Sequence, residues 1–175
     1  EGNGRQMKPV PLTGADIAFL QYTGGTTGVS KGATLTHGNL LANKEQLILW
    51  LEAVFERKKR PAQLNFLCAL PLYHIFALTV NSLMGISMGG CNLLIANPRD
   101  IPAVVKEWKK HQIHIFPGLN TLFNALMNNA EFPSIDFSQM LLVLGGGMAV
   151  QRPVAERWQK MTGCAITEGY GLSET

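Results

Sequence analysis

Residues 22–32 combine the residue types that bind a polyphosphate. The run reads Tyr-Thr-Gly-Gly-Thr-Thr-Gly-Val-Ser-Lys-Gly and follows an apolar stretch. Glycine lets backbone N–H groups approach a ligand closely, hydroxyl groups donate hydrogen bonds, and Lys31 carries a mobile positive charge. The P-loop pattern G-x-x-x-x-G-K-[ST] does not fit, because Ser30 precedes the lysine and Gly32 follows it. We therefore predict a phosphate-binding loop of another kind, between a strand and a helix; a flexible linker is the alternative.

Three further segments suit the same chemistry, although each also has a purely structural interpretation. The imidazole N–H of His74 could orient a carboxylate, whereas a histidine in apolar company is more often structural. The glycines at 145–147 could let a flat group lie against bare backbone, or could form only a strand-to-helix turn. In residues 167–174, Glu174 offers the carboxylate that Mg²⁺ prefers, although a Gly-Tyr-Gly turn beside an acid is common.

Taken in order along the chain, these segments resemble the motifs of adenylate-forming (ANL) enzymes. That superfamily contains acyl-CoA synthetases, firefly-luciferase-like proteins and peptide-synthetase adenylation domains. Their loop reads Tyr-Thr-Ser-Gly-Thr-Thr-Gly-x-Pro-Lys-Gly, and here Gly24 replaces the serine and Ser30 the proline. Residues 71–76 resemble the family's Pro-Leu-Phe-His motif, and the last segment resembles its Tyr-Gly-x-Thr-Glu motif, with Ser173 where threonine is common. Residues 20–43 look most like bacterial long-chain fatty-acid–CoA ligases.

The resemblance implies a role for each segment. The loop would hold the β- and γ-phosphates of ATP, and His74 would lie beside the carboxylate that is activated. Tyr170 would stack on adenine, Ser173 would bond the α-phosphate and Glu174 would hold Mg²⁺ as the metal ligand. The catalytic residues would be His74, Lys31 and Glu174. The nucleotide-binding residues would be Thr23, Gly24, Gly25, Thr26, Thr27, Gly28, Lys31, Gly145, Gly146, Gly147, Glu168, Gly169, Tyr170, Gly171 and Ser173.

The function that the resemblance implies is the ATP-dependent joining of a long-chain fatty acid to coenzyme A, through an acyl-adenylate. The substrates would be fatty acid, ATP and coenzyme A, with Mg²⁺ as the metal. The chain starts at Glu1 rather than methionine and stops within a motif, so we expect a central piece of a longer enzyme. The missing parts would include a small C-terminal domain with a catalytic lysine, and this piece alone is expected to be inactive.

Other functions stay open at this point. Within the superfamily they are a medium-chain or aryl-CoA ligase and a peptide-synthetase adenylation domain. Outside it they are a non-catalytic nucleotide-binding module and, more weakly, a flavodoxin-like electron carrier, since one fold serves many functions.

Composition excludes several classes. The chain has 175 residues and a net charge of +3, which is too small to indicate nucleic-acid binding; the basic run at 57–60 is expected to be a solvated helix end. Its three cysteines lack metal-site spacing and are expected to be reduced core residues of a cytoplasmic protein.

No signal peptide is recognised. Residues 75–96 are predicted to be a buried helix and strand rather than a membrane span. Peripheral contact with the inner face of the membrane is expected only because the substrate is apolar.

Apolar strands alternate with amphipathic helices along the chain. Strands are predicted at 16–22, 63–70, 91–96, 113–116, 140–144 and 164–167, the first of them buried. Helices are predicted after Thr36 as N-cap, at 76–88, after residue 98, at 119–129, and between Pro153 and Gly163. This order predicts an α/β fold: a mainly parallel, flavodoxin-like sheet with helices on both faces, preceded by an extended lead-in at 1–14, so that 15–175 form one subdomain. The four motif segments should meet at the carboxyl edge of the sheet.

Overall fold

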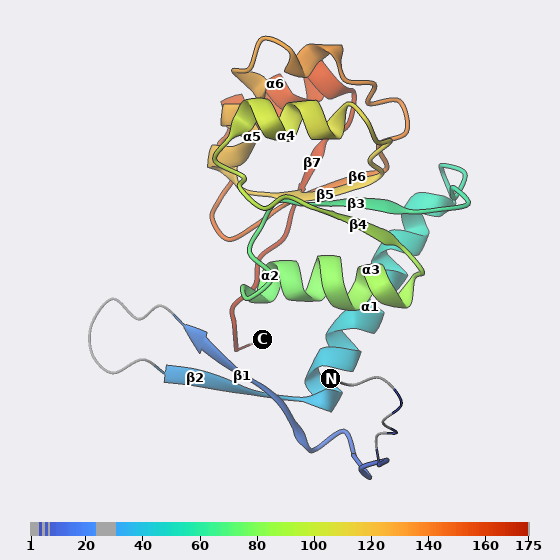
Figure 1. Ribbon diagram of the computed structural model, residues 1–175. Helices are drawn as coiled ribbons and strands as arrows, with labels where there is room; N and C mark the ends of the chain where they lie inside the picture. The colour runs from blue at the N-terminus through green and yellow to red at the C-terminus, as the bar shows by residue number, and fades with distance from the viewer. Residues whose placement is uncertain (1–3, 5, 7, 24–30, 175) are drawn as a thin grey trace.

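Five parallel strands form the centre of the molecule, which a computed structural model describes for residues 4, 6, 8–23 and 31–174 (Figure 1). The strands are adjacent in the order β4-β3-β5-β6-β7. Their bounds are β3 Asn65–Cys68, β4 Cys91–Leu94, β5 Ile115–Gly118, β6 Leu142–Gly145 and β7 Ile166–Glu168. The predicted α/β class with a mainly parallel sheet is confirmed. The predicted division between lead-in and subdomain stays a prediction, and residues 8–13 contain neither helix nor strand.

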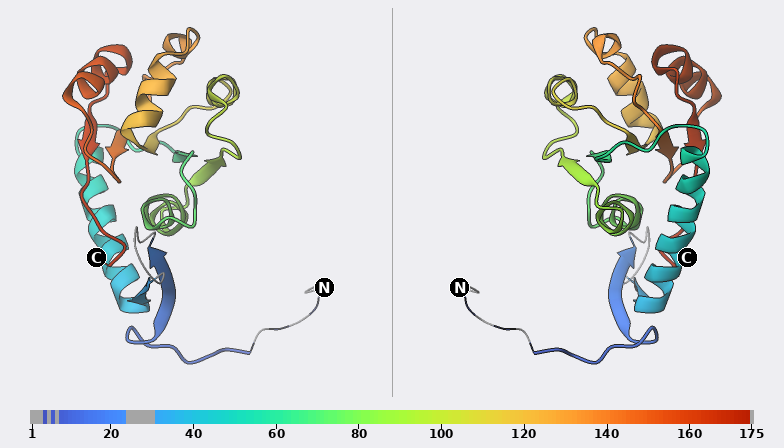
Figure 2. Two further views of the ribbon diagram at one scale, coloured as in Figure 1. Left: turned by 90° about the vertical axis from the view of Figure 1, so that its left-hand side faces the viewer. Right: turned by 90° about the vertical axis from the view of Figure 1, so that its right-hand side faces the viewer.

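Helices cover both faces of this sheet, as predicted (Figures 1 and 2). The connection from β3 to β4 runs toward one edge, whereas the later connections all run toward the other. Because such crossovers are right-handed, the reversal places the first connecting helix on one face and the later ones opposite it. The first face carries α1 (His37–Phe55) and a continuous helix made of α2 (Ile75–Ala77), the π-helical η1 (Leu78–Met84) and α3 (Gly85–Ser87); the second carries α4 (Ile101–Trp108), α5 (Asn120–Met127), the short η2 (Phe132–Ser134) and α6 (Arg152–Thr162).

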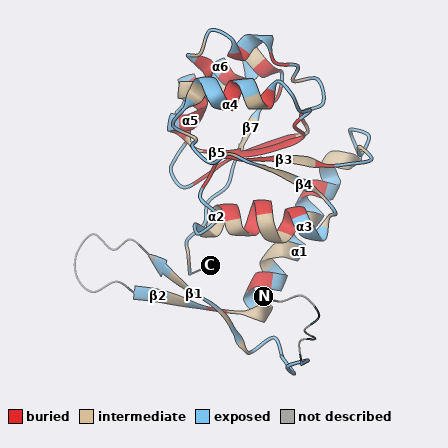
Figure 3. Cartoon of the chain, in the orientation of Figure 1, coloured by how far each residue is buried: buried red, intermediate tan, exposed pale blue. Residues whose placement is uncertain are grey.

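Two hydrophobic cores lie on the two sides of the sheet (Figure 3). Alternate residues of a strand point to opposite faces, so Ile115 packs in one core and Phe116 in the other. The core beneath α4–α6 is rich in aromatic rings: Trp108 and Phe116 have ring centroids 4.9 Å apart, and Trp158 lies 4.9 Å from Phe123. These edge-to-face contacts stabilise the helices over the sheet.

The helix ends follow the local sequence signals. Thr36 caps α1: its hydroxyl accepts a hydrogen bond from the Asn39 N–H, while Asn39 Oδ1 accepts one from the Thr36 N–H. Helix α6 ends at Gly163, whose φ of +73° suits glycine. Both predictions are confirmed.

The first strand forms as predicted, but the prediction that it is buried in the main sheet is wrong. Strand β1 (Ile17–Thr23) exists, but it pairs antiparallel with β2 (Lys31–Thr36) in a separate two-stranded sheet. The predicted phosphate-binding loop therefore joins two strands rather than a strand and a helix. Four apolar side chains of β1 are at least 40% exposed, namely Ile17, Phe19, Leu20 and Tyr22. An apolar run predicts a strand but not its neighbours, and β1 was therefore assigned to the wrong sheet.

Three smaller corrections concern single residues. Cys91 is exposed because it begins the edge strand β4, whereas Cys68 and Cys164 are buried as predicted. The strand predicted to end at residue 116 continues through Pro117 as β5, and the proline is tolerated because β5 pairs with β3 only at Ile115. The spacing of apolar residues after Thr36 predicts Leu41 on the buried face of α1, but this side chain is 55% exposed. The predicted helix in residues 75–96 is confirmed, with Ala77, Val80 and Met84 buried, but the prediction of a buried strand is wrong: the residues of β4 are exposed or half-buried because it lies at the edge of the sheet. None of the helices in the described part of the chain has the length and apolar character of a membrane span.

Candidate functional site

Three of the motif segments meet at the carboxyl edge of the sheet. A Cβ built on Gly146 would lie 3.0 Å from the Phe76 ring and 3.4 Å from the carbonyl oxygen of Gly169. The Gly169 N–H donates to the Gly145 carbonyl over 2.8 Å. The backbone of Gly146 therefore contacts residues that are far away in the sequence. This contact lies close to the point between β3 and β5 where the connections reverse direction. Ligands of open α/β sheets bind at such a point.

The turn after β6 is shaped by its glycines. Gly147 has a φ of +73°, which side-chain-bearing residues rarely adopt, and a Cβ there would lie 3.0 Å from Leu119 Cδ2. A Cβ on Gly145 would come within 2.5 Å of Val150 Cγ2. The turn thus folds back on itself and presents backbone where side chains would not fit.

Two side chains hold the end of this turn. Glu168 Oε2 accepts a hydrogen bond from the Val150 N–H over 3.1 Å, and Asn120 Oδ1 accepts one from the Gln151 N–H over 2.9 Å. Glu168 was predicted to bind nucleotide, and the structure gives its carboxylate a contact within the protein, at the start of α6. Asn120 was missed by the sequence analysis. Its only signal is that it is a polar residue at the start of a helix.

His74 lies at the N-cap of α2, on the loop after β3. The ring Nδ1 of His74 accepts a hydrogen bond from the Phe76 N–H over 3.2 Å, and the backbone N–H of His74 donates to the Pro71 carbonyl over 2.9 Å. Because Nδ1 is the acceptor, the proton of the neutral imidazole lies on Nε2. The ring is exposed, so Nε2–H can donate to a ligand.

The β1–β2 hairpin lies next to the His74 loop. Gln21 Nε2 donates to the Tyr73 carbonyl over 2.8 Å, and Thr23 is paired in register with Lys31. The exposed Lys31 therefore begins β2 directly after the loop. Gly24, Gly25, Thr26, Thr27 and Gly28, predicted to bind phosphate, lie outside the described residues, as does Ser30.

The last motif segment follows β7 and runs toward the hairpin (Figures 1 and 2). Tyr170 is 94% exposed, so its ring is accessible to a ligand. Gly171 and Glu174 are also exposed, and Ser173 is half-buried. Residues 4, 6, 8–23 and 31–174 contain no cluster of three His, Cys, Asp or Glu side chains that could hold a metal. A lone carboxylate such as Glu174 still suits Mg²⁺, which is often held by one carboxylate together with phosphate oxygens and water.

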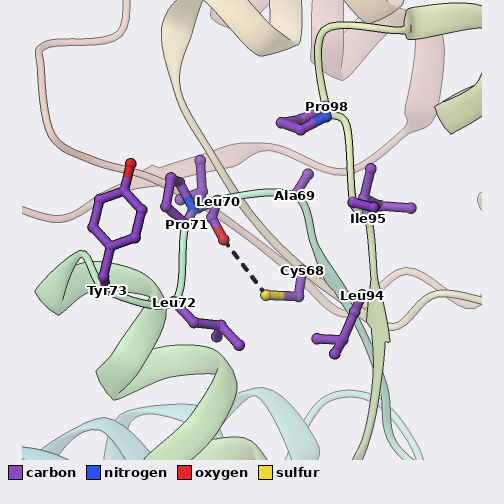
Figure 4. A pocket seen from close by; sticks show the side chains of 10 residues that line it. Cys68, Ala69, Leu70, Pro71, Leu72, Tyr73, Leu94, Ile95 and Pro98 are labelled. Atoms are coloured by element: carbon purple, nitrogen blue, oxygen red, sulfur yellow. Dashed lines mark hydrogen bonds between the residues drawn. The ribbon is translucent and has the colours of Figure 1, made fainter.

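A cavity of about 380 Å³ lies beside the His74 loop, at the carboxyl ends of β3 and β4 (Figure 4). Its lining is mainly apolar and comes from residues 68–73, residues 94–96 and Pro98. The Cys68 thiol donates a hydrogen bond to the Leu70 carbonyl over 3.6 Å, and burial raises the pKa of this thiol. Cys68 is therefore a protonated, unreactive part of the lining.

His114 lies away from these segments. It is 4% exposed, and its Nδ1 accepts a hydrogen bond from the Asn65 N–H over 3.0 Å. Burial lowers the pKa of its imidazole. Its role is structural: it joins the residue before β5 to the start of β3.

Comparison with known proteins agrees with this geometry. The sequence family described as AMP-binding enzyme matches residues 1–175. A long-chain-fatty-acid–CoA ligase of Escherichia coli O6:H1 is 56% identical over 174 residues, and one of Haemophilus influenzae is 52% identical over 176 residues. These matches cover 98% and 99% of this chain but only 30% of each relative. The crystal structure of ATP-bound MatB from Rhodopseudomonas palustris is 25% identical and superposes with a TM-score of 0.76, covering 97% of this chain and 32% of that one.

Proposed function

The chain belongs to the AMP-binding enzyme family, and on that premise we propose that it forms the central part of a long-chain fatty-acid–CoA ligase. The chain spans about 30% of the length of the relatives named above, so the activity belongs to a longer enzyme of which this chain would be one part. The observation that carries the proposal is the contact of the Gly146 backbone with Phe76 and Gly169, which unites three of the motif segments.

In the first half-reaction, a carboxylate oxygen of the fatty acid bonds to the α-phosphorus of ATP, and the bond to the leaving pyrophosphate breaks. Two anions must approach each other, so their repulsion has to be offset. We propose that His74 Nε2–H donates to the carboxylate and orients it. The N–H groups of residues 24–30 and the ammonium of Lys31 would bind the departing phosphates.

In the second half-reaction, the thiol of coenzyme A attacks the acyl carbonyl and displaces AMP. This chain would hold the adenylate meanwhile, with Tyr170 stacked on adenine and the adenine edge against residues 145–147. Ser173 would bond the α-phosphate. Mg²⁺, held by Glu174 and phosphate oxygens, would supply charge neutralisation at the phosphates.

The mainly apolar lining of the cavity beside the His74 loop supports an apolar substrate. We also propose that the enzyme is cytoplasmic and touches the membrane only peripherally, to collect that substrate. Flotation with phospholipid vesicles, with and without fatty acid, tests this proposal, and recovery of the enzyme in the soluble fraction under both conditions would contradict it.

The test of function is acid-dependent ATP–pyrophosphate exchange by the longer enzyme, with acids of short, medium and long chain and with aromatic acids. We expect exchange to be strongest with long-chain acids and to fall in His74→Ala. Preference for aromatic or amino acids would indicate another adenylate-forming enzyme, and no exchange with any acid would indicate a non-catalytic module.

A further inference from the structure

The turn between β6 and α6 is held from both sides. Asn120 Oδ1, at the start of α5, accepts from the Gln151 N–H over 2.9 Å. Glu168 Oε2, at the end of β7, accepts from the Val150 N–H over 3.1 Å. Two consecutive backbone N–H groups thus have side-chain partners, one at the start of α5 and one at the end of β7.

The Gln151 N–H depends on such a partner. The first N–H groups of a helix have no carbonyl acceptor one turn earlier, and Gln151, the N-cap of α6, makes no side-chain capping bond of its own. Asn120 is 9% exposed, so the hydrogen bond is poorly reached by water. Loss of the Asn120 oxygen would leave the Gln151 N–H without its partner, and a shift of the turn would be needed to satisfy it.

The start of α5 also touches the turn at a second point, through Leu119 against Gly147. Val150 in turn lies over Gly145. A displacement at Gln151 would therefore be passed to residues 145–147, whose backbone is packed too closely to absorb it.

We infer that Asn120 is a positioning residue for the nucleotide. Through the Gln151 N–H it fixes the turn against which the adenine is proposed to lie, and it touches no substrate itself. This inference rests on the proposed function, because it assigns the turn to the nucleotide site.

The experiment uses the longer enzyme with three substitutions. Asn120→Leu keeps the branched shape and the number of side-chain heavy atoms but has no acceptor, and Asn120→Asp keeps an oxygen at the same place. Asn128→Leu is the control: Asn128 Oδ1 accepts from Arg157 Nη1 over 2.7 Å and so joins α5 to α6 far from the turn. KM for ATP and for coenzyme A are measured, together with amide hydrogen exchange of residues 145–151.

We expect Asn120→Leu to raise KM for ATP about tenfold, the effect of losing one buried hydrogen bond, with KM for coenzyme A unchanged. Asn120→Asp should stay within about threefold of the wild type, and Asn128→Leu should match it. Exchange of the turn amides should be faster only in Asn120→Leu. If that variant does not fold, Asn120→Ser, with an oxygen too close to the backbone to reach Gln151, takes its place.

An unchanged KM for ATP, or an equal rise in both KM values, would overturn the inference. If the wild-type enzyme formed no acyl-CoA, the proposed function would be overturned instead. Hydrogen exchange then decides the role of Asn120 alone: faster exchange in Asn120→Leu supports it, and unchanged exchange overturns it.

Discussion

Replacing Gly147 by alanine separates backbone strain from function, because Gly163 is a matched control. Both glycines have a φ of +73°. An alanine in this region costs about 1–2 kcal/mol, and the reduced freedom of the unfolded chain offsets about 0.4–1 kcal/mol. A Cβ on Gly163 meets nothing within 4 Å. We expect Gly163→Ala to lower the free energy of unfolding by about 1 kcal/mol and to leave catalysis unchanged.

In Gly147→Ala the same strain is combined with crowding. The new Cβ would lie 3.0 Å from Leu119 Cδ2, the end of a flexible side chain that can move by a few tenths of an ångström. The low end of the overpacking cost, about 1 kcal/mol, applies, so the total loss is about 2 kcal/mol. Because the strain and the contact act on the same residue, we expect the turn to shift by a few tenths of an ångström as well. A shift of that size in a positioned site should lower kcat/KM for ATP about tenfold.

Urea denaturation gives the two stabilities, and steady-state kinetics of the longer enzyme give the two values of kcat/KM. Equal losses of kcat/KM in both variants would refute the placement of the turn in the nucleotide site. A larger loss of stability in Gly163→Ala than in Gly147→Ala would refute the account of strain and contact.

Three further predictions concern single side chains. Tyr170→Ala should weaken ATP binding, measured by calorimetry, by about 1–3 kcal/mol, the value of one stacked base, without lowering the melting temperature, because the ring is 94% exposed. Burial lowers the pKa of folded His114 below its ordinary 6.5, so the stability that it contributes is complete above pH 6.5 and is lost as pH falls through the folded pKa. His114→Gln should therefore make the midpoint of urea unfolding depend less on pH in that range, and an unchanged dependence on pH would contradict this. Trp158→Ala should cost about 3–5 kcal/mol in urea unfolding, because the ring is fully buried, whereas the exposed Trp50→Ala should cost less than about 0.5 kcal/mol; similar losses would contradict the core described above.

The helices and central strands could be predicted because their signals are local. Pro153 and Gly163 mark the two ends of α6 through the backbone angles that each residue favours, and the structure places Pro153 in the first turn and Gly163 directly after the last helical residue. Thr36 likewise predicts the start of α1. Strand β1 shows the limit: its apolar side chains predict extended structure, but pairing with β2 instead of the main sheet depends on contacts that no local pattern specifies.

The candidate site could be predicted in outline for a similar reason. The carboxyl-edge rule brings residues 71–76, 145–148 and the segment after β7 together, and the structure places Phe76, Gly146 and Gly169 in contact. The rule says nothing about which side chains support the turns. Asn120 and Gln151 are 31 residues apart, and neither belongs to a motif, so their hydrogen bond could be found only in three dimensions. The same holds for the cavity beside the His74 loop.

The strand order has a consequence for how the protein is made. Among these five strands, β3 leaves the ribosome first and becomes an interior strand, β4 is added on one side of it, and β5, β6 and β7 are added in turn on the other. Each new strand pairs with one already synthesised, and each arrives with the helix that covers it. The sheet can therefore grow outward during translation without waiting for a distant partner, and the open edges of β3, β5 and β6 are covered in turn by β5, β6 and β7, whereas β4 stays at the edge of this sheet.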